Sequence, residues 1–470
     1  MRPPHLFGIE TEYGLLHTDM NDPHAAERLS HGVRDHLFDK KRVGLLDMHH
    51  RAHDEPAGNG GFLLNGGRFY IDMGHVEYAT PECTRLSELV AFNRAGDLLL
   101  HQSLDEMGLL ESASFIKNNI DYETGATFGA HENYLVSRDF PFTQEGLAQL
   151  VPFLTTRQIF SGTGRLGANF VPEGFVALGD AKFPDIPFQI SQRADHIVSD
   201  LYQWVQFSRA IINTRDEPLA DPERFRRMHL LLGDSNLCEY ATALKIGTTA
   251  LVLDLIHEGL APILDLLEPV MALKIISRDP TRRWKIRLLD GRETRALDIQ
   301  RAYLEAAKKY LAGENDDTDW TLQAWETMLN DLEKNDVEVL VGRVDWASKL
   351  SLFTQFKESE NLDWQDPWLK SLDLEYHNLD PERGLYLALE SEGKIARLST
   401  DEAIQQATTM PPVASRAAGR AYLIRKLMEK PAPYVINWAS FYLEKDVLGT
   451  TDPFKNYLKE AKAMWENQSI

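Results

Sequence analysis

Two short stretches of the chain, FGIETEYG and RFYIDMGHVE, carry polar side chains at alternate positions. Their acidic, basic and phenolic residues are Glu10, Glu12, Arg68, Tyr70, Asp72 and, after a glycine turn, Glu77. Because the side chains of a strand alternate between its two faces, each stretch predicts a strand with polar groups on one face. Asp and Glu are poor strand formers, and crowded carboxylates need a cation between them. Hard oxygen ligands suit Mg²⁺, so the pattern predicts a magnesium site.

The same residue types indicate phosphoryl transfer to a carboxylate. No serine or cysteine stands in a pattern typical of a catalytic triad. A carboxylate is a poor electrophile, and transfer of a γ-phosphate converts it into an acyl phosphate, while Mg²⁺ and arginine offset the charge on the transferring group. An attacking lysine amine must then lose a proton to a carboxylate base.

Two arginines farther along the chain are candidates for binding phosphate. Arg215 ends the segment AIINTRDEP, and Arg227 lies in RFRRMHLLL. The planar guanidinium group suits phosphate because it donates two parallel hydrogen bonds. A salt bridge with Asp216 or Glu223 explains the same residues equally well, so the pattern leaves both interpretations open.

His131 lies in a strand-like segment, GAHENYLV, among other polar residues. The members of this polar cluster are Asn118, Asn119, His131, Glu132 and Asn133. We expect a hairpin through Gly125 to bring its two arms together. One histidine in such a place is often structural, and the neighbouring Glu and Asn raise the odds of a catalytic role.

The polar segments need a scaffold, and the remaining pattern predicts one. PFQISQRADHI is expected to form a strand with Ser191, Arg193 and Asp195 on one face. A long helix is expected over 84–107, and a second one after RMHLLL, with Asp234 or Ser235 as its N-cap. Further helices are expected over 297–311, 319–333 and 346–356, followed by a small unit from about residue 398.

Two motifs have simpler explanations than the sites they resemble. His49, His50 and His53 have spacing that could hold zinc on a helix, but the Asp-Glu-Pro and glycine run after them predicts a solvated loop. SGTGRLG has the glycine spacing of a dinucleotide-binding loop. Because residues 168–172 have a strand or loop pattern and no helix pattern, we interpret it as a glycine turn.

Composition is typical of an ordinary globular protein. Of the 470 residues, 43% are hydrophobic and 26% are charged, which suffices for a large core in two or more units. The net charge of −21 argues against a nucleic-acid partner. Only two cysteines, Cys83 and Cys238, are present, which excludes a disulfide framework. With no signal-peptide pattern and no long apolar run, we expect a cytoplasmic protein without membrane contact.

A series of long motifs resembles one family of enzymes. These motifs are GIETEYG, NGGRFYID, EYATPEC, KNNIDYETGATFGAHENYL, SQRAD, INTRDEP and GDSNL. From Phe7 to about Lys455 the chain is similar to the enzymes of prokaryotic ubiquitin-like protein (Pup) modification, which are the Pup ligase and the related depupylase and Pup deamidase. The resemblance implies an α+β fold, a glutamine-synthetase-like antiparallel sheet packed with helices, plus a small C-terminal domain. We therefore expect a catalytic domain over 1–397 and a small domain over 398–470.

The resemblance also implies roles for matching positions. The implied Mg²⁺ ligands are Glu10, Tyr70 and Glu77, the implied ATP contacts are Arg68, Thr80 and Trp438, and the implied base is Asp72. His131 and Arg215 are implied on the phosphate side, where Arg227 is the second candidate arginine. The expected cofactors are ATP and Mg²⁺, and the expected partners are a Pup-like modifier and lysine-bearing target proteins.

The chain resembles both branches of this family. FGIETEYG and EYATPEC resemble the ligase, whereas the spacing of DMGHVEY and the segments FQISQRAD and PERGLY resemble the depupylase. We expect an ATP-dependent ligase that joins the side-chain carboxylate of the modifier's C-terminal glutamate to a lysine. Hydrolysis of that isopeptide, or of a C-terminal glutamine amide, is the alternative. A ligase of free glutamate and an inactive binding module are further alternatives, and the intact Glu10, Asp72 and Glu77 set argues against the inactive module.

Overall fold

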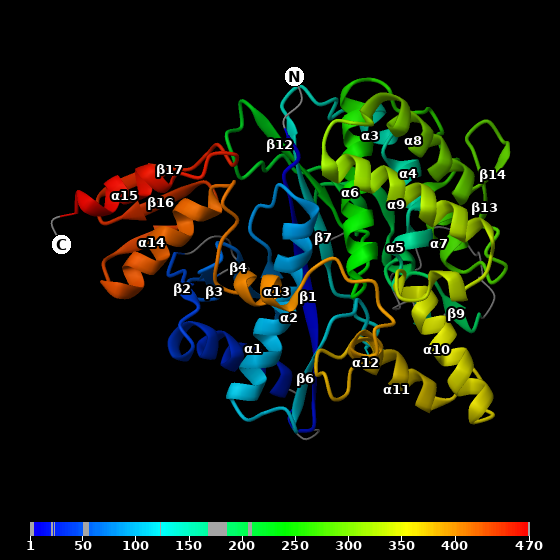
Figure 1. Cartoon of the computed structure of the whole chain (residues 1–470), viewed down its shortest axis with the longest axis horizontal. Helices are drawn as coiled ribbons and strands as arrows, with labels where there is room; N and C mark the ends of the chain where they lie inside the picture. Colours follow the sequence, from blue (N-terminus) through cyan, green and yellow to red (C-terminus); the bar gives the residue numbers. More distant parts are fainter. Residues whose placement is uncertain are drawn as a thin grey trace.

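A computed structural model describes residues 4–468, apart from 20–21, 23, 50–55, 123, 168–185 and 205–208. One large sheet runs through the middle of the molecule, helices cover it, and a small C-terminal unit lies at one end (Figure 1). This arrangement confirms the predicted α+β class with a mostly antiparallel sheet. His50, His53 and residues 168–172 lie outside the described residues.

The large sheet has ten strands. Nine follow one another in space in the order β10 (Ser199–Tyr202), β11 (Ala210–Asn213), β12 (Phe225–Leu230), β7 (Ala130–Ser137), β1 (Phe7–His17), β5 (His75–Ala79), β4 (Arg68–Asp72), β3 (Gly60–Leu63) and β2 (Gly44–Leu46). Neighbours pair antiparallel, except β10 and β11, which are parallel. The tenth strand, β6 (Ala113–Ile116), pairs with the second half of β1. The longest strand, β1, is therefore the one around which the others assemble.

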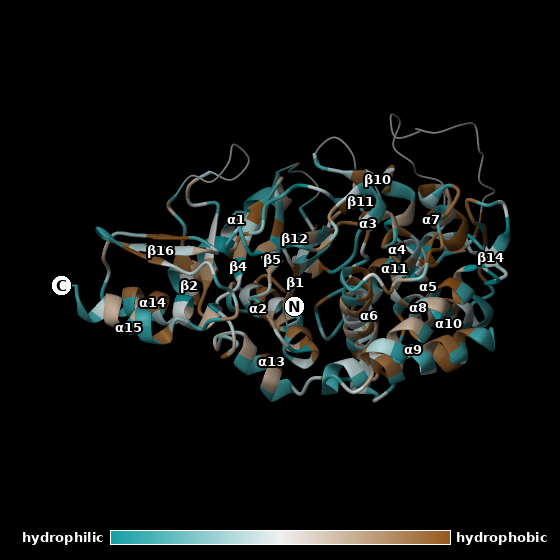
Figure 2. Ribbon diagram, turned by 90° about the horizontal axis from the view of Figure 1, so that it is seen from above, coloured by the Kyte–Doolittle hydropathy of each residue, from teal (hydrophilic) through white to brown (hydrophobic). Residues whose placement is uncertain are grey.

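One face of this sheet is apolar and packs against helices. The odd-numbered residues Ile9, Thr11 and Tyr13 of β1 are buried. Helices α2 (Leu86–Glu106) and α6 (Glu239–His257) lie on this side (Figure 2). Since residues alternate along each strand, the even-numbered residues of β1 lie on the other face, and this alternation is the one predicted from the sequence.

Further helices surround the sheet, and three of them, α8 (Ala296–Leu311), α9 (Asp316–Glu333) and α10 (Asp345–Ser359), match predicted segments. Others are α1 (Ala25–Asp35), α3 (Gln144–Ala148), α4 (Val151–Thr156), α5 (Gln158–Ser161), α7 (Pro269–Ser277), α11 (Pro367–Tyr376), α12 (Leu385–Ser391) and α13 (Asp401–Ala407). Two short hairpin-like pairs, β8 (Arg165–Leu166) with β9 (Phe188–Gln189) and β13 (Lys285–Arg287) with β14 (Glu293–Arg295), complete this part. The helices predicted over 84–107, 297–311, 319–333 and 346–356 are confirmed.

The hairpin predicted through Gly125 is confirmed: Ile120 and Thr127 form an antiparallel bridge, and the Phe128 N–H donates to the Asn119 carbonyl at 3.0 Å. Two other local predictions are wrong. PFQISQRADHI is not one strand: β9 ends at Gln189, and Asp234 accepts backbone hydrogen bonds from Gln192 and Arg193, which bends the chain into a loop. The N-cap of α6 is Cys238, and the side chain that accepts its backbone N–H belongs to Asp345, far away in the sequence.

The C-terminal unit packs against the β2 end of the sheet. It contains α14 (Ala417–Glu429), β15 (Tyr434–Ile436), β16 (Ser440–Leu443), β17 (Asp446–Gly449) and α15 (Leu458–Glu466). Its apolar side chains, among them Leu423 and Phe441, form one cluster with Phe62 of β3. The unit is therefore anchored on the large sheet, and the predicted boundary at residue 398 stays a prediction.

No helix in the described ranges has the length and apolar character that crossing a membrane requires.

Candidate active site

The polar face of the sheet gathers side chains from five adjacent strands. On β1, Glu12 pairs with Glu77 of β5, and Glu77 pairs with Tyr70 of β4. On its other side β1 places Glu10 opposite His131 of β7. Directly paired residues point to the same face, so the two polar stretches predicted from the sequence do meet.

The hairpin between β4 and β5 sets the position of Glu77. Met73 and Gly74 form its two-residue turn, and both have positive φ, of 45° and 90°. Such turns match the right-handed twist of the flanking strands and fix the register between them. Asp72 consequently pairs with His75, and Glu77 returns to the face that carries Tyr70.

Glu12, Asp72 and Glu77 form a crowded group of carboxylates. Each offers an oxygen, and these oxygens lie within 4.8 Å of one another. The Tyr70 hydroxyl donates a hydrogen bond to Glu77. Burial, and next the negative charges of Glu12 and Glu10, raise the pKa of Glu77 well above its ordinary value. A cation among these oxygens would remove the repulsion, so the group has the chemistry of a site for Mg²⁺.

Glu10 faces two histidines. Its Oε2 atom lies 3.3 Å from Nδ1 of His131 and 3.6 Å from Nε2 of His229. Burial raises the pKa of Glu10, but hydrogen bonds with His131 and His229 outweigh it and hold the pKa well below its ordinary value. Burial and the charge of Arg227 lower the pKa of His229 to about 4. The sequence prediction missed His229, although it lies two residues after Arg227 on β12 and therefore shares a strand face with it.

Arg227 points toward Glu10, and Arg215 does not. The Arg227 guanidinium lies 3.8 Å from Glu10, donates a hydrogen bond of 3.0 Å to Asn133, and is held by Glu217 at 3.1 Å. Arg215 is 59% exposed and donates to Glu217 at 3.2 Å. Both arginines therefore have an ion pair, with Glu217 as partner, but only Arg227 lies beside the carboxylates. The catalytic role of Arg215 stays a prediction.

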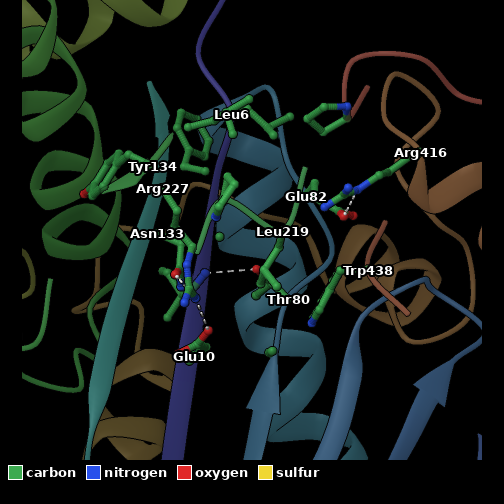
Figure 3. A pocket seen from close by; sticks show the side chains of 17 residues that line it. Leu6, Glu10, Thr80, Glu82, Asn133, Tyr134, Leu219, Arg227, Arg416 and Trp438 are labelled. Atoms are coloured by element: carbon green, nitrogen blue, oxygen red, sulfur yellow. Dashed lines mark hydrogen bonds and ion pairs between the residues drawn. The ribbon is translucent and has the colours of Figure 1, made fainter. Parts of the chain in front are cut away.

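A cavity opens beside Glu10. Its lining includes Thr80, which directly follows β5, Arg227 and, from the C-terminal unit, Trp438. Figure 3 shows Arg227 directed at Glu10 and Trp438 entering from the side of the C-terminal unit. The Thr80 hydroxyl accepts a hydrogen bond of 3.1 Å from the backbone of Ile9, which fixes it at the edge of β1.

Arg68 is connected to this cavity through aromatic rings. It is only 6% exposed, and its guanidinium lies 4.5 Å from the centre of the Tyr70 ring and 6.0 Å from that of Phe62. The Phe62 ring meets Trp438 edge to face at 5.0 Å. The residues predicted to contact a nucleotide, Arg68, Thr80 and Trp438, are thus brought to one end of the polar face.

Two arginines of the C-terminal unit bind Glu82, and one of them, Arg420, also contacts Trp438. Glu82, which follows β5, accepts hydrogen bonds of 2.6 Å from both Arg416 and Arg420. Arg420 also donates to the Trp438 carbonyl at 3.1 Å and lies 4.7 Å from its ring centre. We call Glu82, Arg416 and Arg420 the latch. The sequence prediction missed it, although Arg416 and Arg420 have the spacing of neighbours on a helix.

The predicted polar cluster around His131 is split between the two faces of the sheet. His131 and Asn133 share the site face. Glu132 lies on the opposite face, where Arg157 donates two hydrogen bonds to it. The side-chain amide of Asn119 donates a hydrogen bond of 3.0 Å to the Ser235 hydroxyl and so holds the loop that ends there. Adjacent residues of a strand point to opposite sides, which the prediction of one cluster ignored.

Known proteins resemble the chain over nearly its whole length. A family model described as Pup-ligase protein matches residues 5–442. The chain is 38% identical over 464 residues to a Pup--protein ligase of Acidimicrobium ferrooxidans, covering 96% of this chain and 95% of that relative. It is 40% identical over 380 residues to a Pup deamidase/depupylase of Mycolicibacterium smegmatis, covering 79% of this chain and 73% of that relative.

Solved structures show the same similarity. The structure of a complex between Pup and its ligase PafA aligns with a TM-score of 0.83 at 32% identity, covering 98% of this chain and 92% of that one. The structure of the Pup ligase PafA in complex with ADP aligns with a TM-score of 0.77 at 33% identity, covering 93% of this chain and 94% of that one.

Proposed function

This chain belongs to the Pup-ligase protein family, and we propose that it is an ATP-dependent ligase. The bond that it forms joins the side-chain carboxylate of the C-terminal glutamate of a Pup-like modifier to the amine of a lysine on a target protein. The ligase relative is matched over 95% of its length, against 73% for the deamidase/depupylase. This difference favours ligation over hydrolysis.

ATP is proposed to bind in the cavity between β1 and the C-terminal unit. The observation that carries the proposal is that Thr80, Trp438 and Arg227 line one cavity whose floor includes Glu10. Trp438 offers a ring for the base, and the guanidinium of Arg227 suits phosphate oxygens. Arg68, held against Tyr70, is proposed as a further contact. The similar ligase was solved with ADP.

Mg²⁺ is proposed to bind next to this cavity. Glu10, Tyr70 and Glu77 would hold it, and the carboxylates of Glu12 and Asp72 lie close enough to Glu77 to face the same ion. When bound, the ion would offset negative charge on the transferring phosphoryl group. The raised pKa of Glu77, caused by burial and by its acidic neighbours, supports this assignment.

The remaining roles belong to protein side chains. Asp72 ends β4 beside the turn at Met73 and is proposed as the base that accepts the proton of the attacking lysine amine. His131, beside Glu10, is proposed to act near the phosphate, and Arg215 is proposed on the outer side of the same region. Phosphorylation of the modifier's carboxylate makes its carbon electrophilic, and the amine then displaces phosphate.

Amide hydrolysis is the second candidate function. It is supported by 40% identity to the deamidase/depupylase relative. In that reaction Asp72 would either activate a water molecule or attack the amide carbon itself, and no lysine amine would take part. The nucleotide site beside Asp72 would be the same.

The test uses purified protein, Mg²⁺-ATP, a lysine-bearing target and two synthetic modifiers, one ending in glutamate and one in glutamine. We expect ADP release and a new isopeptide with the glutamate form, measured by coupled assay and mass spectrometry. Conversion of the glutamine form to glutamate without steady ADP release would instead establish the amidase. ADP formed from free glutamate alone would point to a small-molecule ligase.

Asp72→Asn separates chemistry from binding in the same assay. We expect turnover to fall by about 10³-fold, the middle of the range for loss of a general base, with unchanged ATP affinity. Glu111→Gln, at an exposed carboxylate beyond α2, is the matched control and should keep full activity. Full activity of Asp72→Asn would overturn the assignment of the base.

A further inference from the structure

A group of three arginines and one histidine borders the carboxylates on the side away from the cavity. It consists of Arg165 on β8, Arg193, His196 and the half-buried Arg209, which precedes β11. We call these four residues the arginine cluster. Neither the nucleotide nor the metal assignment above uses any of them.

Arg165 is buried and forms no ion pair with any residue that the structure describes, although its charge helps lower the pKa of Asp195. It is 4% exposed, and its Nε and Nη1 atoms have no hydrogen-bond partner within the described structure. The ring of Tyr122 lies 5.8 Å from its guanidinium carbon. Burying a charged group without pairing costs several kcal/mol, on the order of the stability of a whole domain, so such a group points to a ligand.

Arg193 is buried against neutral acceptors only. It is 3% exposed, and its two Nη atoms donate to Thr127 Oγ1 at 2.8 Å and to the carbonyls of Phe128 and Leu231 at 2.9 and 3.0 Å. Its Nε atom has no partner in the ranges that the structure covers. These bonds fix the direction of the guanidinium without an ion pair in the described ranges, and the charges of Glu12 and Asp234 act on it from a distance.

The pKa values of His196 and Arg193 are lowered by burial and by the positive charges of the neighbouring arginines. Burial, and next the charges of Arg193 and Arg165, lower the pKa of His196 to about 3, so its imidazole is neutral. Its buried Nε2 atom also lacks a partner among the residues with described positions. Burial and the charge of Arg209 lower the pKa of Arg193 to about 10, with Glu12 opposing the shift.

The position of the cluster follows from the backbone that holds Arg193. Gly129 follows Phe128, and a Cβ atom built on Gly129 would lie 2.5 Å from Glu12 Oε1. The Phe128 ring lies 4.6 Å from the ring of His75, the residue paired with Asp72. Along β1, Glu10 borders the cavity and Glu12 lies farther from it, so the cluster and the cavity lie at opposite ends of the carboxylate group.

We propose that the arginine cluster binds the α-carboxylate of the modifier's C-terminal glutamate. This inference rests on the proposed ligation of that residue. A C-terminal glutamate has two carboxylates joined by a short side chain. Anchoring the α-carboxylate at Arg193 and Arg209 directs the side-chain carboxylate toward Glu12 and Asp72, with the nucleotide approaching from the other end. Guanidinium groups suit a carboxylate because they donate paired, charge-assisted hydrogen bonds.

The test compares two modifiers that both end in glutamate, one with a free α-carboxylate and one with an α-carboxamide. Their dissociation constants are measured by fluorescence anisotropy with a label at the modifier's N-terminus, so that turnover is not required. We expect the wild-type protein to bind the free acid about 30-fold more tightly than the amide, as for a charged hydrogen-bonding pair. Arg193→Met and Arg209→Met should each reduce this ratio to about 3-fold or less.

Two controls separate recognition from folding and from the proposed function. Arg301→Met changes an arginine on the surface of α8 that donates to Asn330, and it should keep the wild-type ratio. ATP affinity should be unchanged in Arg209→Met, because Arg209 does not line the proposed nucleotide cavity. Equal wild-type affinity for acid and amide, or an unchanged ratio in both cluster variants, would overturn the subsite. If the wild-type protein binds neither modifier, the proposed function itself fails.

Discussion

At the scale of single residues, one sheet face holds carboxylates in two different electrostatic states. Glu10 faces histidines and Arg227, and its pKa is held well below its ordinary value although burial opposes this. Glu77 faces Glu12, and burial together with the charge of Glu12 raises the pKa of Glu77 well above its ordinary value. Since the two residues lie on adjacent strands, the difference comes from their partners and not from the depth of burial. The Glu77 group is consequently the part that gains most from a cation.

Glu77→Gln tests this conclusion through stability. Removing one carboxylate relieves repulsion, so in the absence of divalent ions we expect the variant to be more stable than the wild type by about 1 kcal/mol, the equivalent of roughly one pKa unit. Mg²⁺ should raise the thermal midpoint of the wild type and leave that of Glu77→Gln nearly unchanged. Glu402→Gln, at an exposed position of α13, should behave as the wild type does. Equal Mg²⁺ responses in wild type and Glu77→Gln would contradict the assignment.

At the scale of elements, close contact between α2 and β5 supports the site from behind. Gly96 of α2 lies so near Tyr78 that a Cβ atom there would be 2.4 Å from the ring. Tyr78 is 1% exposed and its hydroxyl accepts a hydrogen bond of 3.1 Å from Asn65, so the ring has no room to move. Because Tyr78 follows Glu77 on β5, the packing on the apolar face helps determine where the carboxylate lies on the other face.

Gly96→Ala should therefore reduce both stability and activity. We expect a loss of about 1–3 kcal/mol from overpacking, together with slower ADP release because β5 is displaced. Gly32→Ala in α1 is the matched helix glycine, where the nearest atom to a new Cβ is the flexible Met107 Cε at 3.5 Å. That variant should gain about 0.5–1 kcal/mol and keep its activity. Thermal denaturation of both variants measures the contrast, and similar shifts in the two would contradict it.

At the scale of the whole molecule, the latch joins the C-terminal unit to the sheet next to the cavity. Arg420 contacts Glu82, the carbonyl of Gly66 and Trp438 at once. It also lies 5.1 Å from the Phe62 ring, within the apolar cluster that anchors the unit. The position of Trp438, and with it the closure of the cavity, therefore depends on this one contact region between sequence-distant parts.

Arg420→Met should weaken the joint between the two parts. Breaking a buried ion pair costs about 3–5 kcal/mol because the partner stays charged and buried. We expect a lower thermal midpoint and a KM for ATP raised by about 10-fold or more, with a smaller change in the KM for the modifier. Lys426→Met, on the same helix and paired with the exposed Glu429, is the control. An unchanged KM for ATP would show that Trp438 does not depend on the latch.

Glu82 also makes this joint sensitive to acid. Burial raises its pKa, but the charges of Arg420 and Arg416 outweigh burial and leave the pKa lowered in the folded state. A carboxyl with a lowered folded pKa stabilises the fold fully above its unfolded pKa of about 4.3, and this contribution is lost as pH falls through the folded value. The difference in thermal midpoint between wild type and Glu82→Gln should be largest near pH 7 and shrink below about pH 4. A constant difference would contradict this role.

The amino-acid sequence by itself determined the local chemistry of this protein. Alternation in FGIETEYG and RFYIDMGHVE placed the carboxylates, Arg68 and Tyr70 on common strand faces, because the side-chain period of a strand is a local property. The α+β class and the long helices followed from similar periodicity and from the family resemblance.

Only the tertiary structure decided which of these groups meet. The pairing of β1 with β7, and of β7 with β12, brought His131 and His229 to Glu10, and it placed Glu132 on the opposite face. Asp234 and Asp345 bind backbone N–H groups far away in the sequence, which turned an expected strand into a loop and replaced an expected helix cap. The latch and the arginine cluster likewise join distant segments. Such contacts depend on how whole elements pack, and no local pattern of residues encodes that packing.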